Sequence, residues 1–269
     1  NPERCPQRSQ RHVVITVSLS HACSPSGQMD VLPWYFIRPP PKTYFLIPVK
    51  TVSGDGMNIL YVYAHPEPRS FNGALKDTAM VTLGKMGHTV KVSNLYAVRW
   101  KAILDSQDFR MRQDPYQFNP ALEQIHGIQT GSLSPDILEE IERVAWADLI
   151  ICQFPLWWSS MPAILKGWFD RVFVQGFVVN LEKGQVYERG LLKGKKAMVV
   201  VTTGATREMY SPEGVHGDIM HHISLITHNI FEFVGMTPLP SFIVFGAAGM
   251  TMDEGSLQLN RYKTVLEKL

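Results

Sequence analysis

The run DLIICQF at residues 148–154 decides the fold, because it is apolar almost without interruption. A strand covered by helices on both faces gives such a run, whereas a strand with one face in water alternates apolar and polar residues. Similar runs lie at 58–64, 197–202 and 241–246, with a shorter one at 89–93, and helical patterns separate them at 71–86, 134–146, 162–172, 217–234 and 254–268. The alternation predicts an α/β fold: a doubly wound, parallel, five-stranded sheet in the order 2-1-3-4-5 with helices on both faces.

The composition excludes several classes of protein. The chain has 269 residues, is 45% hydrophobic and carries a formal net charge of +2, so it lacks the basic surplus of a nucleic-acid-binding protein. Its three cysteines cannot form a disulfide framework, and neither they nor the histidines show metal-ligand spacing. No apolar run reaches the roughly 18 residues of a membrane span. We therefore expect a cytoplasmic protein with no metal, no nucleic-acid partner and no integral membrane segment.

Residues 1–56 differ from the rest of the chain. They hold eight of the 18 prolines and show no long helical period. We interpret residues 1–56 as a disordered extension outside the domain, which then covers residues 57–269 and begins at Met57. The alternative is a targeting peptide, because Arg4, Arg8 and Arg11 precede a short apolar stretch.

The first candidate binding loop follows the strand at 58–64, since ligands of open α/β sheets bind outside the carboxyl ends of strands. Its sequence HPEPRSFNG (65–73) is a proline-containing turn, with Ser70 as the candidate N-cap of helix 71–86. Free N–H groups and the positive end of the helix dipole attract anions at such a place, and His65, Arg69 and Asn72 add donors. The loop predicts a phosphate or diphosphate site, with a plain capped turn as the alternative.

Aromatic side chains and a glycine follow the next two strands in the sheet. Trp157 and Trp158 come after residues 148–154 and suit a planar ligand, with core or dimer packing as the alternative. Gly204 follows residues 197–202 and permits close approach of backbone amides to a ring. Tyr210 and His216 lie further along and can donate hydrogen bonds to an anion that develops on that ring, although a loop histidine can also be merely solvated.

Together these loops resemble those of the FAD-dependent NAD(P)H:quinone oxidoreductases, or DT-diaphorases, whose fold is flavodoxin-like. The resemblance covers residues 57–269 and rests on YAHPEPRSFNGALK (63–76), SNLYAVRW (93–100), SLSPDI (132–137), ADLIICQFPLWWSSMPAILKGWFDRVF (147–173), GLLKGKKA (190–197) and TTGATREMYSPEGVHGD (202–218). It implies that FAD lies across the switch point of a homodimer, in a site that both subunits share.

The resemblance also implies roles for individual residues. Contacts to the diphosphate and adenosine of FAD map to His65, Ser70, Phe71, Asn72 and Ala74, and to Asn119, where the family often has glutamine. Contacts to the flavin ring map to Pro155, Leu156, Trp157, Trp158, Thr202, Thr203, Gly204, Ala205 and Tyr210. Tyr210 and His216 would stabilise charge on the flavin during ping-pong transfer of hydride from NADH or NADPH to a quinone.

Three departures from the family qualify these expectations. Val179 and Leu181 stand where the quinone pocket often has an aromatic pair, which predicts a wider pocket. His216 stands where a relative that prefers dihydronicotinamide riboside has asparagine, which favours NADH or NADPH here. A relative binds a metal through two helix histidines and a cysteine near its C-terminus. This sequence has His228, but Glu232 at the second position and no such cysteine, so we do not expect a metal site here. Two other functions stay open: a flavodoxin-like regulatory subunit of a potassium efflux system, and an FMN-dependent azo- or nitroreductase.

Overall fold

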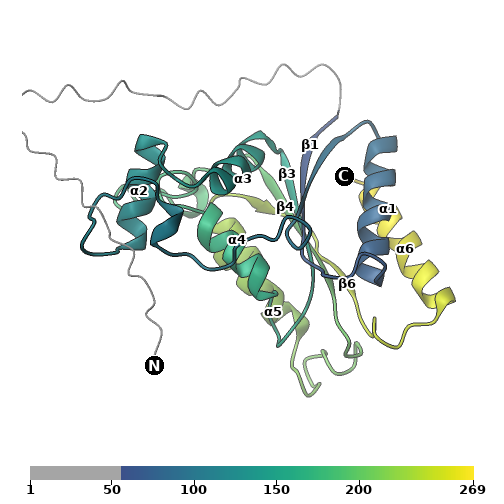
Figure 1. The fold of residues 1–269 in the computed structure, drawn as a ribbon. Coiled ribbons are helices and arrows are strands. Elements are labelled where there is room, and N and C mark those ends of the chain that lie inside the picture. Colours follow the sequence, from purple (N-terminus) through teal and green to yellow (C-terminus); the bar gives the residue numbers. More distant parts are fainter. Residues whose placement is uncertain (1–55) are drawn as a thin grey trace, which may run out of the picture. The chain divides into compact units, whose positions relative to one another are not determined.

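The computed structural model describes residues 56–269, which form one parallel sheet between two layers of helices (Figure 1). The sheet contains β1 (Asn58–Tyr63), β2 (Thr89–Asn94), β3 (Leu149–Pro155), β4 (Lys196–Thr202) and, beyond β4, β5 (Thr237–Pro238), in the order β2-β1-β3-β4-β5. The predicted order 2-1-3-4-5 is therefore confirmed. The expected extension lies, apart from Gly56, outside the described residues.

The fifth strand is split into two short pieces. β5 pairs with Lys196 and Ala197 at the start of β4, and β6 (Phe242–Val244) pairs with Val200–Thr202 at its end. Pro238 and Pro240 lie at this interruption, and proline has no N–H to give to a ladder. The strand predicted at 241–246 is thus β6 alone.

Helices cover both faces of the sheet, which explains why β3 is buried at every position. α1 (Phe71–Lys85) and α6 (Met252–Leu266) pack on Ile59, Tyr61 and Tyr63 of β1. α3 (Pro135–Trp146), α4 (Ala163–Val172) and α5 (Ile219–Ile226) pack on the opposite face, against Leu60 and Val62 (Figure 1). Successive side chains of β1 point to opposite faces of the sheet and therefore belong to two separate hydrophobic cores.

Two helical features differ from the prediction. The pattern at 217–234 is α5 followed by a π-helical turn, η3 (Thr227–Glu232). α2 (Pro120–Thr130) was not predicted, because Gly127 interrupts its apolar pattern. A side chain at Gly127 would place Cβ only 2.5 Å from the end of the buried Leu133 side chain, which would have to move to make room. Across residues 56–269, every helix is too short or too polar to cross a bilayer.

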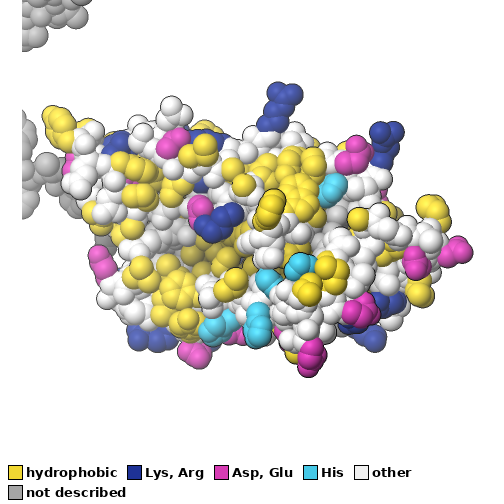
Figure 2. All heavy atoms as spheres, turned by 90° about the horizontal axis from the view of Figure 1, so that it is seen from below, with side chains coloured by type: hydrophobic (Ala, Val, Ile, Leu, Met, Phe, Trp, Pro, Cys, Tyr) yellow, Lys and Arg dark blue, Asp and Glu magenta, His cyan; other side chains and the backbone are white. Residues whose placement is uncertain are grey.

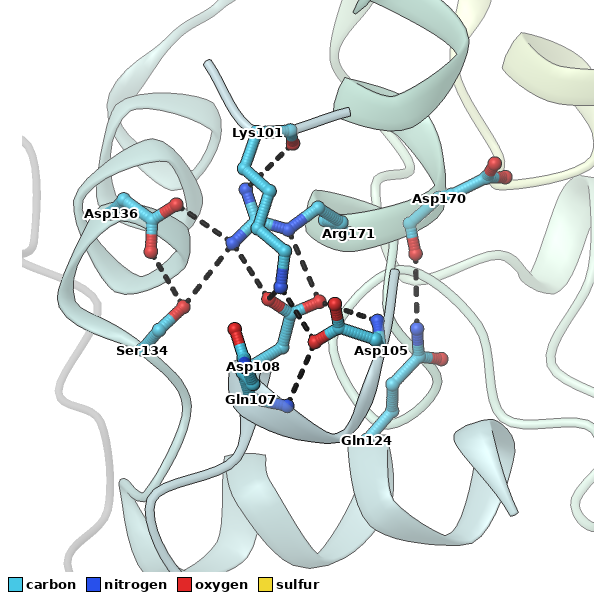
Figure 3. A network of polar contacts seen from close by, with 9 residues as sticks. All are labelled: Lys101, Asp105, Gln107, Asp108, Gln124, Ser134, Asp136, Asp170 and Arg171. Atoms are coloured by element: carbon cyan, nitrogen blue, oxygen red, sulfur yellow. Dashed lines mark hydrogen bonds and ion pairs between the residues drawn. The ribbon is translucent and has the colours of Figure 1, made fainter. Parts of the chain in front are cut away.

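A buried ion cluster fixes the long connection between β2 and α3 (Figure 3). Arg171 of α4 is 1% exposed and donates to Asp108 over 2.9 and 3.2 Å. Its guanidinium also lies 2.7 Å from Asp136, while Lys101 lies 2.9 Å from Asp108 and 2.6 Å from Asp105. Burial favours the neutral form of Asp136, but hydrogen bonds from Ser134 and Arg171 outweigh it and hold its pKa below the ordinary value.

Candidate functional site

The N-terminus of α1 forms the first part of the site. Ser70 caps the helix, with Oγ accepting from the Gly73 N–H at 3.2 Å, and Nδ1 of His65 lies 3.0 Å from the same oxygen. A side chain at Gly73 would place Cβ 1.9 Å from the carbonyl oxygen of Pro68, so the turn requires glycine. The N–H groups of Phe71 and Asn72 have no acceptor within the described part of the chain. Two amides at the positive end of a 15-residue helix are therefore free to bind an anion.

The side chain of Asn72 points into the protein rather than toward a ligand. Its Nδ2 donates to Thr202 Oγ1 at 2.9 Å, and Gln153 Nε2 donates to the Asn72 carbonyl oxygen at 2.7 Å. Tyr61 donates to Gln153 and lies 3.1 Å from the hydroxyl of Tyr262. Burial raises the pKa of Tyr61 well above its ordinary value, so this chain of polar groups stays neutral. Asn72 can thus offer a ligand its free N–H, while the bond between the Asn72 and Thr202 side chains ties α1 to β4.

Three other predicted residues contribute in different ways. Phe71 packs beside Gly255 of α6, so its ring belongs to the interface between α1 and α6. Ala74 donates its N–H to Ser70 at 3.0 Å, which leaves its methyl group for contact. Asn119 caps α2 and accepts from the Leu122 N–H at 3.3 Å, and within residues 56–269 no contact joins it to the other predicted site residues.

A strained turn after β3 carries the two tryptophans. Trp157 and Ser160 exchange backbone hydrogen bonds of 2.9 and 3.0 Å, and Trp158 and Ser159 between them have φ of 50° and 60°. Positive φ at both central residues is the geometry of a type I′ turn, which bulky side chains rarely adopt. Trp158 is 100% exposed and Trp157 is 41% exposed, with its ring 6.2 Å from that of His65. Strain of this kind concentrates at functional sites.

The neighbouring strand ends hold this turn beside a glycine. Pro155 is buried at the end of β3, and the Leu156 N–H donates to Thr202 at 2.7 Å. Thr203 is also buried, and its hydroxyl accepts from the Ala205 N–H at 3.0 Å, which leaves Gly204 exposed between them. Among residues 56–269, no group accepts from the N–H of Trp158, Ser159 or Gly204. The ends of β3 and β4 therefore present free amides that suit the acceptor atoms of a planar ring.

Tyr210 and His216 lie together on the next loop, as predicted. Tyr210 is 7% exposed, and its ring centroid is 4.9 Å from that of His216. The loop is held by the His216 N–H, which donates to Met209 at 2.9 Å, and by the Ile219 N–H, which donates to Tyr210 at 3.1 Å. The hydroxyl of Tyr210 has no hydrogen-bond partner in the described structure, so it can serve a ligand. The arrangement provides a hydrogen-bond donor and an ionisable ring side by side.

Sequence reasoning missed His222, which touches two parts of the site. Its ring lies 5.6 Å from Tyr210, and its nitrogens lie 3.2 Å from the Ser159 oxygen and 3.3 Å from the His216 oxygen. The available signal was its position one helical turn after Asp218, the N-cap of α5. Figure 2 looks onto this edge of the molecule, where histidine side chains gather beside hydrophobic ones.

The described part of the molecule has two notable hollows, of which only the first is lined by a residue of the candidate site. An open groove of about 850 Å³ lies between β6, α6 and the loop that precedes α5, with Tyr210 on its wall. A second, of about 450 Å³, is lined by Val179 together with aromatic side chains of α4 and of the segment after η3, whereas Leu181 is exposed and does not line it. His228 is paired with Glu232 at 2.6 Å.

Comparisons with known proteins agree with this architecture. A family model described as a flavodoxin-like fold matches residues 57–266. The chain is 44% identical to a ribosyldihydronicotinamide dehydrogenase [quinone] of Pongo abelii, over 71% of this chain and 82% of that protein. It is 37% identical to NAD(P)H dehydrogenase [quinone] 1 of Cavia porcellus, over 78% of this chain and 76% of that protein. The crystal structure of a putative quinone reductase from Klebsiella pneumoniae superposes with a TM-score of 0.75 at 39% identity, covering 79% of this chain and 84% of that one. The chain therefore belongs to the quinone reductase family of flavodoxin-like proteins.

Proposed function

We propose that this protein is an FAD-dependent oxidoreductase that transfers hydride from NAD(P)H to quinones, two electrons at a time. The observation that carries the proposal is the meeting of three features at one edge of the sheet. These are the free amides of α1, the free amides of the tryptophan turn and Gly204, and the pair Tyr210 and His216. The donor set fits FAD, because the first group suits a diphosphate and the second suits the oxygens and nitrogens of the ring.

Each part of the site then has a defined task. Phe71 and Asn72 bind the diphosphate through their N–H groups, with Ser70 and His65 beside them. The tryptophan turn and Gly204 orient the ring, and the exposed tryptophans exclude water from it. Tyr210 donates a hydrogen bond from its hydroxyl, and His216 can hold a proton next to it. The bound flavin supplies the hydride chemistry itself.

We infer a ping-pong sequence in which NAD(P)H leaves before the quinone enters, as the resemblance to the quinone oxidoreductases implies. Both substrates would then use the same side of the ring, beside Tyr210 and His216.

Asn119 caps α2 outside this constellation. The hollow beside Val179 is apolar. Both fit a homodimer in which each subunit completes the other's site, and we propose this assembly for a cytoplasmic enzyme.

The hydride donor has two candidates. His216 favours NADH or NADPH, since a relative that prefers dihydronicotinamide riboside has asparagine at the matching position. The 44% identity to a protein named ribosyldihydronicotinamide dehydrogenase favours the riboside instead. Initial rates with each donor at equal concentration decide between them. We expect NADH or NADPH to be faster, and a faster rate with the riboside would reverse the assignment.

The proposal is tested by an absorbance spectrum of the purified protein, followed by chromatography of the released cofactor. We expect bound FAD that is bleached by NAD(P)H without oxygen and restored by a quinone. FMN would indicate an azo- or nitroreductase instead. Flavin that quinones do not reoxidise, together with a membrane protein that co-purifies, would indicate a regulatory subunit of an efflux system. Failure to bind flavin after added FAD would overturn the proposal.

A further inference from the structure

We propose that His222 is a positioning residue that ties the tryptophan turn to the loop carrying Tyr210 and His216, and so fixes the two surfaces between which the flavin ring is proposed to lie. The inference rests on the proposed flavin function. His222 lies in the first turn of α5 and is 63 residues away from Ser159 in the chain. No other side chain in the described structure contacts the backbone of both segments through hydrogen bonds.

The partners of the imidazole make the tie depend on its protonation. Nδ1 lies 3.2 Å from the carbonyl oxygen of Ser159, and Nε2 lies 3.3 Å from the carbonyl oxygen of His216. Carbonyl oxygens only accept, so each ring nitrogen must donate if both bonds are to form. A neutral imidazole has one N–H and an imidazolium has two. The neutral ring therefore makes one of the two bonds, and the protonated ring makes both.

Both tied segments need an external support. The turn bends through two left-handed residues, Trp158 and Ser159, and its own hydrogen bonds only close it on itself. The loop meets His222 through the backbone of His216 and the ring of Tyr210, which stands edge-on at 86°. Opening the bridge would let the turn move while the strand ends beneath it stay fixed by the sheet.

Several titratable groups lie on the elements around His222. The loop carries Tyr210 and His216 against its ring, and Arg207, Glu208 and Glu213 at other positions. The start of α5 carries His221 and Asp218, whose carboxylate accepts from the Met220 N–H at 2.9 Å, and the turn at 157–160 carries none. The carbonyl oxygens of Ser159 and His216 lie within hydrogen-bond distance of the His222 ring, so a change of its charge acts most directly on them.

Flavin affinity at two pH values tests the proposal. Because an imidazolium makes both bonds and a neutral imidazole makes only one, the bridge should be stronger at the lower of the two pH values. His222→Leu removes both bonds and should raise the flavin dissociation constant about tenfold at pH 6, with a smaller increase at pH 8. His222→Gln keeps one donor group, so its flavin dissociation constant should lie between those of the wild type and of His222→Leu. His221→Gln, an exposed neighbour on the same helix, is the matched control and should behave as wild type at both pH values.

The measurement is quenching of flavin fluorescence by the flavin-free protein, with thermal unfolding to verify each variant. Quinone KM and kcat are measured in parallel. A wild-type protein that binds no flavin refutes the proposed function itself. If the wild type binds flavin and His222→Leu matches it at both pH values, this inference alone is refuted. If the leucine variant does not fold, His222→Gln decides. A difference in flavin dissociation constant between variant and wild type that is larger at pH 6 than at pH 8 supports the proposal. A difference that is the same at both pH values, or absent, overturns it.

Discussion

Replacing Gln153 with leucine should destabilise the protein by about 3 kcal/mol, although the two side chains have similar size. Gln153 is fully buried in β3, accepts from Tyr61, and donates to the carbonyl oxygen and to Oδ1 of Asn72 at 2.7 and 3.2 Å. It is the central member of the polar chain that connects α6 to the end of β4. Leucine offers neither a donor nor an acceptor.

The expected loss of unfolding free energy depends on which hydrogen bonds the partners of Gln153 retain in the variant. Tyr61 retains Tyr262 at 3.1 Å, and the Asn72 carbonyl remains in the ladder of α1, so each of these lost bonds costs about 1 kcal/mol. Asn72 Oδ1 has no second donor among the described residues and stays in the interior, at a cost of about 1–3 kcal/mol. Added apolar burial returns about 1 kcal/mol.

Urea unfolding followed by far-ultraviolet circular dichroism measures this loss. Gln129→Leu, on the exposed surface of α2, is the control and should change the unfolding free energy by less than about 0.5 kcal/mol. FAD at about 100 times its dissociation constant should stabilise wild type and variant alike by about 2.7 kcal/mol if it binds only the folded state. A Gln153→Leu protein within about 0.5 kcal/mol of wild type would refute the assigned network.

Four further changes test the site and its support. Tyr210→Phe should lower kcat for quinone reduction about 100-fold in stopped-flow measurements while flavin still binds, and an unchanged rate would remove the hydroxyl from the mechanism. Ser70→Ala should cost about 1 kcal/mol in urea unfolding, since the Gly73 N–H loses its acceptor; no loss would mean that the cap is dispensable. Asp108→Asn leaves the buried Arg171 without its main counter-charge and should cost about 3–5 kcal/mol, again by urea unfolding, whereas a neutral result would show that Asp136 suffices. Because the pKa of Asp136 is lowered in the folded state, its contribution is present above the unfolded pKa of about 3.9 and is lost as pH falls through the folded pKa; thermal unfolding should therefore separate Asp136→Asn from wild type at pH 7, with a difference that shrinks as the pH is lowered below about 3.9.

The central strands were predictable because burial on both faces requires a continuous run of apolar residues, which is visible in the strand's own sequence. β3 shows it most clearly, with every residue buried. α2 was not predictable, since Gly127 is there for contact with Leu133, a residue beyond the helix itself. The split of the fifth strand depends on where β4 offers partners on either side of Pro238 and Pro240.

The loops of the candidate site were predictable from strand order, but the directions of their side chains were not. Asn72 turns inward because the register of β1 and β3 places Gln153 opposite Tyr63, within reach of α1. His222 meets Ser159 only because α5, which begins after a long loop, brings it to the turn that follows β3. Such contacts join residues far apart in the chain, and no local pattern encodes them.

The two outer strands of the sheet have a consequence for how the protein meets other copies of itself. β5 has only two residues, one of which is Pro238, and Pro240 follows before β6 begins. At the opposite border, β2 exposes Thr89 and Lys91, and the lysine lies over the ring of Trp146 at 4.3 Å. Proline and lysine at a border strand discourage a foreign strand from adding to the ladder. Within residues 56–269, the border strands therefore resist strand-to-strand aggregation, and a specific association through this part of the chain would use its helices and loops.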